Sequence, residues 1–199
     1  MADTRNADLT FGATDYLVYL APLNTAAPTG VADPAAAWQC LGWVTTEGGV
    51  VKFDEESKDI EAAGSQEPIR TLMTKSTKSA QVTFLEGLNP LVRSLYDNVP
   101  VSALKPTTDV ATYALPDKPA DLRYAFLFDT MDGTKRVRLY APNGKVTERG
   151  DEKPQTDDVM SVEMTFKFYK GAGNSAALSR TIKYGGIDMS SFFPTTSGS

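Results

Sequence analysis

The chain contains no histidine among its 199 residues. Histidine is the usual general base near neutral pH, the usual partner of a nucleophilic serine or cysteine, and the commonest metal ligand. Enzymes that use carboxylates or lysine alone remain possible without it. The absence lowers the expectation of an enzyme, and we predict no catalytic residue, no cofactor and no metal site.

Cysteine and long hydrophobic runs are also scarce. Cys40 is the only cysteine, so an intrachain disulfide is excluded, and we expect its thiol to be a small buried side chain. No apolar run approaches the length that crosses a bilayer, and the polar start of the chain lacks the apolar segment of a secretory signal. We therefore expect a soluble protein that stays where it is made and has no membrane partner.

Positive charge is in the minority, with 20 Lys and Arg against 25 Asp and Glu, a formal net charge of −5. A protein that binds nucleic acid without sequence preference must neutralise phosphates, so this balance argues against that class. Lys135, Arg136 and Arg138 form a basic spot, but no interleaved aromatic residues accompany them for stacking on bases. We interpret the spot as an exposed strand that is protected by charge.

Short strand patterns dominate what is present. Residues 160–168 alternate between apolar and polar side chains without a break, and residues 16–20, 80–85 and 179–184 also read as strands. One helix is predicted over residues 89–96, with asparagine as its cap and proline in its first turn. The predicted fold is mainly β: one antiparallel β-sandwich or partly closed barrel with one short flanking helix.

The clearest hairpin covers residues 122–141, because Asp132-Gly133 is a preferred pair for a two-residue type I′ turn. This turn fixes the predicted register on both faces of the hairpin. It places Phe128 opposite Val137, Phe126 opposite Leu139, Tyr124 opposite Ala141 and Asp129 opposite Arg136. One core should contain Tyr124, Phe126, Phe128, Val137, Leu139, Val162, Met164, Phe166, Val82 and Phe84.

The chain divides into one domain with peripheral segments. We predict a flexible N-terminal arm over residues 1–13, a β-sandwich domain over 14–184 and a polar C-terminal tail over 185–199. Within the domain, residues 47–66 read as a long acidic loop and residues 97–121 as a second long connection.

Two motifs have a functional and a plain interpretation. Residues 171–176 have the glycine spacing of a dinucleotide fingerprint, but too little chain follows for a Rossmann unit, so a glycine hairpin turn is the better interpretation. The acids around residues 54–61 lack the alternating ligands and central glycine of a calcium loop, so a solvated loop is favoured there.

Several segments resemble the tail tube proteins, or major tail proteins, of long-tailed, non-contractile bacteriophages. The clearest is residues 38–49, WQCLGWVTTEGG, which is similar to an aromatic-Leu-Gly-Tyr/Trp-Val-(Ser/Thr)-x-(Glu/Asp)-Gly stretch of that family. The others are YLVYLAPL at 16–23, TAAPT at 25–29, DEESKDI at 54–60 and the segment 71–96 with LEGLNP at 85–90. Together they cover about half of the chain.

The resemblance implies a structural protein of the siphovirus virion that is assembled in the bacterial host cytoplasm. In that family six copies form a ring, the rings stack, and DNA leaves through the bore without specific binding. It further implies contacts with the tape measure, tail terminator and distal tail proteins. For the long loop it implies a contact between rings, which we place on Glu47, Asp54, Glu55, Glu56, Asp59 and Glu61.

Two other interpretations of the sequence stay open. A monomeric β-sandwich that acts as a binding or virion decoration module would remain a monomer in solution, which distinguishes it from a tube protein. A carboxylate-dependent enzyme of the glycosidase kind needs two acids that flank a sugar-binding cleft, and the sequence offers no acids bracketed by exposed aromatic residues.

Overall fold

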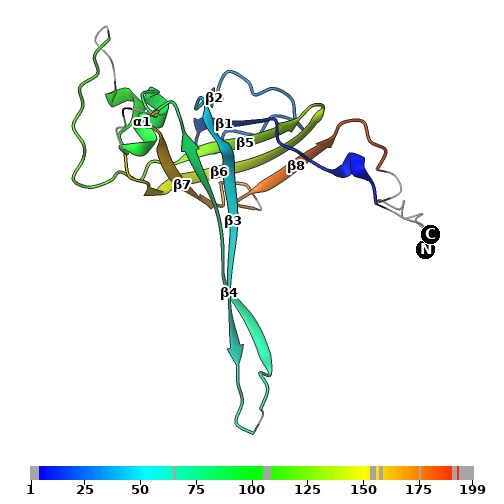
Figure 1. Cartoon of the computed structure of the whole chain (residues 1–199). Helices are drawn as coiled ribbons and strands as arrows, with labels where there is room; N and C mark the ends of the chain where they lie inside the picture. Colours follow the sequence, from blue (N-terminus) through cyan, green and yellow to red (C-terminus); the bar gives the residue numbers. More distant parts are fainter. Residues whose placement is uncertain are drawn as a thin grey trace.

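The structure is a computed structural model that describes residues 5–64, 66–104, 109–152, 156, 159–174, 176–189 and 192. Its α-helix is α1 (Pro90–Tyr96), and its short 3-10 helices are η1 (Ala7–Leu9) and η2 (Val101–Ala103). The strands are β1 (Asp15–Pro22), β2 (Gln39–Cys40), β3 (Val44–Ile60), β4 (Arg70–Phe84), β5 (Tyr124–Asp132), β6 (Lys135–Arg149), β7 (Val162–Tyr169) and β8 (Ser179–Tyr184) (Figure 1). The predicted mainly β fold with one short helix is confirmed.

The strands form one antiparallel sheet in the order β2-β1-β5-β6-β7-β4-β3. Strand β6 carries β5 on one edge, while β8 and β7 occupy successive stretches of its other edge. The sheet curls over its core: the rings of Phe126 on β5 and Phe166 on β7 lie 5.0 Å apart although β6 separates their strands. A flat sheet would hold such strands about 10 Å apart. The curled sheet does not close into a barrel, because β2 and β3 remain its two ends.

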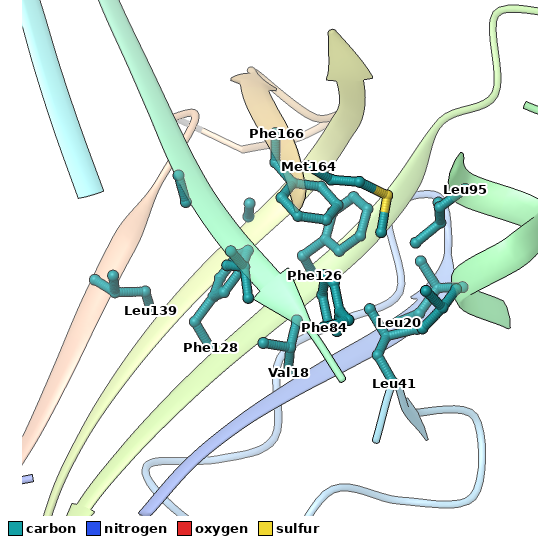
Figure 2. Packing of buried hydrophobic residues seen from close by; sticks show 14 of the residues in the cluster. Val18, Leu20, Leu41, Phe84, Leu95, Phe126, Phe128, Leu139, Met164 and Phe166 are labelled. Atoms are coloured by element: carbon teal, nitrogen blue, oxygen red, sulfur yellow. The ribbon is translucent and has the colours of Figure 1, made fainter. Parts of the chain in front are cut away.

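The main core lies on the concave face of this sheet (Figure 2). Alternation along β7 buries Val162, Met164, Phe166 and Phe168, as its sequence predicts. Helix α1 covers one end of the core with Val92 and Leu95. Eight of the ten predicted core residues are buried here; Tyr124 is only partly buried, and Val137 lies outside the cluster, on a stretch flanked by exposed β8.

A smaller cluster lies on the opposite face of β1, β5 and β6, and the following residues form it: Ala21, Trp38, Ala125, Leu127 and Tyr140. The loop of residues 24–37 is held over this face by hydrogen bonds from β6. The hydroxyl of Tyr140 donates to the carbonyl of Thr25 at 2.9 Å, and Arg138 donates to the carbonyl of Ala32 at 2.8 Å. This loop therefore covers that face of β1, β5 and β6.

Arg138 corrects the interpretation of the basic spot. Its guanidinium is buried and pairs with Asp129 on β5, through Nε–Oδ1 at 2.7 Å and Nη2–Oδ2 at 2.6 Å. Lys135 and Arg136 are half-buried and donate to backbone carbonyls of Thr10 and Val31. The spot is thus not a freely exposed charged strand: its cations hold neighbouring segments in place.

The predicted hairpin register is wrong by two residues. The closing pair is Asp132 with Lys135, so the turn residues are Gly133 and Thr134, one position later than predicted. Phe128 pairs with Leu139 and Phe126 with Ala141, and Asp129 pairs with Arg138 instead of Arg136. A shift of two keeps every side chain on its predicted face. In the observed register Gly133, with a φ of +57°, is the first of the two turn residues, where a type II′ turn prefers glycine, and the buried Arg138 stands opposite a carboxylate.

Three smaller expectations have different outcomes. Asn89 caps α1 as predicted, accepting a 3.0 Å hydrogen bond from the Leu91 amide. Residues 171–174 form a turn, but not a hairpin, because β7 and β8 both pair with β6 and not with each other. Cys40 is exposed, because its short strand lies at the sheet edge while its neighbours Trp38 and Leu41 are buried instead.

The peripheral segments are partly described. Within residues 5–13, the amide of Gly12 donates to Asp132 at 3.1 Å, which attaches this segment to the β5–β6 turn. In the connection of residues 97–121, the Tyr113 hydroxyl donates to Asp97 at 2.7 Å. Residues 1–4, 105–108, 190–191 and 193–199 lie outside the described residues.

Candidate assembly surfaces

The most prominent surface is a two-stranded ribbon that projects from the domain (Figure 1). It is formed by β3 and β4 beyond the point where β4 loses its other neighbour, since β7 pairs with β4 only from Lys78 to Phe84. We define residues 54–77 as the arm. Within the described residues, β3 pairs only with β4, so the outer edge of β3 is free along the arm.

The arm corrects the prediction of a long loop at residues 47–66. Strand β3 continues to Ile60, and only residues 61–69 connect it to β4. The sequence does not reveal the outer part of β3, because both faces of the arm are open to solvent and no alternation of apolar and polar residues marks the strand. Pairing with β4 supplies backbone hydrogen bonds that a solvated loop would make with water instead.

Two irregularities interrupt the ribbon. Between the pairs Val44–Phe84 and Gly49–Val82, residues 45–48 of β3 stand opposite only Thr83, which makes a large bulge. Farther out, Thr74 is an extra residue on β4, and its hydroxyl donates to the Glu56 carbonyl at 3.0 Å. The arm therefore leaves the domain at one bulge and changes register at another.

The structure brings five of the six predicted contact acids together on the arm. Asp54, Glu55, Glu56 and Asp59 are exposed on β3, and Glu61 follows at the tip. Glu47 is not among them, because it lies in the bulge where β3 enters the domain.

Two of these acids have partners within the arm. Glu56 forms an ion pair with Lys75 across the ribbon, and this hydrogen bond raises the pKa of Lys75. Thr71 donates its hydroxyl to Asp59 at 2.6 Å. No group of three or more acidic or cysteine side chains that could hold a metal ion occurs in the described part of the chain.

The two strands of the arm differ in charge. Residues 54–61 of β3 and the tip carry five acids and one lysine, whereas residues 70–78 of β4 carry Arg70, Lys75, Lys78 and no acid. Exposed apolar side chains lie among them, with Phe53 at 54% exposure and Met73 at 66%. The arm thus presents an acidic edge, a basic edge and apolar side chains that its own domain does not cover.

A groove lies between the beginning of β1 and the bulge of β3, where the two strands approach without pairing. Its lining includes Tyr16, Trp43, Glu47 and Leu85, and its volume is about 540 Å³. The hydroxyl of Tyr16 is buried against Gly49, and no hydrogen-bond partner for it is found among the described residues. Burial raises the pKa of Tyr16. This groove marks the place where β1 and β3 do not pair and the curled sheet stays open.

A comparison with protein families gives one match that spans almost the whole chain. The family model described as "Phage tail tube protein" matches residues 3–182. The chain belongs to the phage tail tube protein family. It is a tail component of the virion, and its mainly β fold with one helix is the fold that the sequence predicted.

Solved structures also resemble this tail tube protein. A chain from the "virion of native gene transfer agent (GTA) particle" has a TM-score of 0.43 and 11% identity, covering 86% of this chain and 99% of that one. A chain from the sheath/tube terminator of an extracellular contractile injection system has a TM-score of 0.43 and 6% identity, covering 88% and 99%. A chain from the anti-feeding prophage cap has a TM-score of 0.41 and 8% identity, covering 92% and 100%. These scores are low, so the assignment rests on the family match.

No curated protein matches the sequence. In the described residues, no helix is long and apolar enough to cross a membrane.

Proposed function

We propose that this tail tube protein assembles into stacked hexameric rings, which form the tail tube of a long-tailed, non-contractile phage and conduct DNA into the host. The arm is the observation that carries the proposal. A two-stranded ribbon without a third strand or a core is at best marginally stable in water. Such a ribbon gains its stability when another molecule covers it, and the family offers the neighbouring ring as that molecule.

The projecting shape and the chemistry of the arm suit a contact with a second subunit. The arm leaves the domain as one straight projection (Figure 1), and the exposed Met73 on the arm and Phe53 at its base provide apolar area that another subunit would bury. Its carboxylates on Asp54, Glu55, Glu56, Asp59 and Glu61 would meet basic groups on the adjoining ring. Glu47 would contribute separately, at the base of the arm.

The charge of the chain suits a conduit for DNA. Six chains of formal charge −5 give a ring of about −30, which repels phosphate and keeps DNA from binding to the wall. In this role the chain performs no catalysis and needs no cofactor. Its further partners would be the tape measure, tail terminator and distal tail proteins, and assembly would take place in the cytoplasm of the bacterial host.

Sedimentation of the full chain at increasing concentration tests the hexamer. We expect a species with the mass of six chains, or larger assemblies that are multiples of it. A chain that sediments as a monomer at every concentration, even with tail initiation proteins present, would instead support a binding or decoration module.

A further inference from the structure

Strand β8 has a free edge that the domain leaves uncovered. It pairs with β6 through residues 179–184, and no strand pairs with its other edge in the described part of the chain. Five of its six side chains are exposed, including Ile182 at 44%. Unpaired edges of this kind are templates for another strand unless they are protected.

The absence of a neighbour follows from the divergence of the arm. Strand β7 ends on β6 at Asn143, and β8 occupies the next stretch of the same edge. In a flat sheet, β4 would run on past the end of β7 and lie beside β8. The arm instead turns away from β8 (Figure 1), so the β8 edge and the arm both stay unpaired in one subunit.

We propose that the β8 edge of one subunit receives the β3 edge of the arm from a second copy of this chain, as an added strand. The inference rests on the proposed function, because it supplies the receiving surface for the contact between rings. Main-chain hydrogen bonds between two free edges would provide the attachment. The charges of the two strands would select this pairing over others.

Charge complementarity is present on both faces of the two strands. On β8, Arg180 shares a face with Leu139 of β6, whereas Lys183 lies on the other face beside Arg136. Each face of β8 therefore carries one exposed cation.

The β3 edge of the arm carries the opposite charge on both of its faces. Glu55 and Asp59 point to one face. Asp54 and Glu56 point to the other face together with Lys58, so that face keeps one net negative charge. Opposite charges on adjacent strands stabilise their pairing, and like charges destabilise it. Two copies of β8 would repel each other, whereas β8 and the acidic β3 edge attract whichever faces align.

The basic β4 strand of the arm is a poorer occupant of the same edge. Arg70 and Lys75 would stand against Arg180 and Lys183, with no acid on that strand to compensate. The charge pattern thus assigns β3, and not β4, to the contact with β8.

A charge-swap experiment on the full chain tests this pairing. Arg180→Glu with Lys183→Glu reverses the charge of β8, and Asp54→Lys with Glu55→Lys replaces one acid by a lysine on each face of the arm. We expect each double variant to reduce tube yield at least tenfold in sedimentation and negative-stain microscopy. Their combination in one chain should restore tubes in part, because each face of the arm then offers an introduced lysine to a glutamate introduced on β8.

Matched controls carry the same charge changes elsewhere. Lys118→Glu with Lys170→Glu and Asp109→Lys with Asp117→Lys alter exposed residues outside the two strands and should leave tube yield within about twofold of wild type. Thermal unfolding identifies any variant that fails to fold. For such a variant, cysteine cross-linking between Lys183→Cys and Glu55→Cys in a Cys40→Ser background replaces the yield assay. The cross-link should appear in tubes and be absent from the unassembled subunit.

The outcomes separate this inference from the proposed function. Suppose that the wild-type chain forms tubes. Normal tube yield from the β8 variant, or no restoration of yield in the combined variant, would then overturn the pairing while the tube function stands. Wild-type tubes in which cysteines scanned along residues 53–59 never cross-link to β8 would overturn it as well. Failure of the wild-type chain to assemble would count against both.

Discussion

Arg138 and Asp129 form a doubly hydrogen-bonded ion pair in which each side chain is only 1% exposed. The guanidinium also donates to the carbonyls of Gly30 at 3.3 Å and Ala32 at 2.8 Å. One side chain therefore neutralises a buried carboxylate and fixes the loop that covers the convex face of β5 and β6. The pair thus joins the two strands of the hairpin and holds the loop over them.

Removal of one partner should strongly destabilise the subunit. Arg138→Met leaves Asp129 buried and unpaired, and we expect a loss of about 3–5 kcal/mol in the free energy of unfolding, measured with urea. Arg136→Met is the matched control, because that side chain is closer to solvent and its loss should cost roughly 1 kcal/mol. Equal losses in both variants would contradict a special role for the buried pair.

The Tyr16 hydroxyl should be dispensable for stability. It is buried against Gly49 without a hydrogen-bond partner among the described residues, so folding removes it from water without compensation. Tyr16→Phe should raise the free energy of unfolding by about 1 kcal/mol or leave it unchanged. Gly49→Ala is the opposite case, since a β-carbon there would overlap the hydroxyl, and it should destabilise the chain. A clear loss of stability in Tyr16→Phe would show that the hydroxyl has a partner.

The ion pair between Arg93 on α1 and Glu152 after β6 should give a small stability term that depends on pH. The hydrogen bond from Arg93 lowers the pKa of Glu152 from its ordinary 4.5. A lowered carboxyl pKa contributes stability that is present above the unfolded-state pKa and is lost as the pH falls through the folded-state pKa.

Glu152→Gln should therefore be less stable than wild type by roughly 0.5 kcal/mol at neutral pH, because the pair is partly exposed. The difference should vanish below the folded-state pKa of Glu152. Asp117→Asn is an exposed control that should show no difference at either pH. A deficit of Glu152→Gln that persists in acid would exclude the electrostatic explanation.

Excision of the arm should separate folding from assembly. Replacement of residues 55–76 by Asn-Gly keeps the pair Asp54–Thr77 and closes the ribbon with a favoured two-residue turn. Because the excised side chains are almost all exposed, we expect a folded subunit whose melting temperature changes by only a few degrees. It should form no tubes in electron micrographs. Tubes of normal length and yield would remove the arm from the assembly mechanism.

The sequence predicted the elements whose two faces differ. The alternation of Val162, Met164 and Phe166 marks β7 because one face is buried and the other is not. Helix α1 was recognisable because Asn89 and Pro90 are local start signals that need no tertiary context.

The rest depends on contacts that a local pattern does not contain. The arm has two solvated faces, so nothing in the alternation of residues 54–60 distinguishes it from a loop. The hairpin turns at Gly133-Thr134 and not at Asp132-Gly133, and this register places Arg138 opposite Asp129, where its guanidinium donates to a loop more than a hundred residues earlier in the chain. Strand β8 was predicted, but its free edge follows from the divergence of the arm, which only the topology reveals. Of the six predicted contact acids, the structure groups the five on the arm and places Glu47 apart, and their contact with a neighbour stays a prediction.

Cryo-electron microscopy of tubes grown from the full chain, alone or on tail initiation proteins, tests the central claim most directly. The account predicts stacked rings of six subunits around an open bore, with the arm of every subunit crossing into the adjoining ring. Rings of another number, arms that stay within their own ring, or monomers under every condition would contradict it.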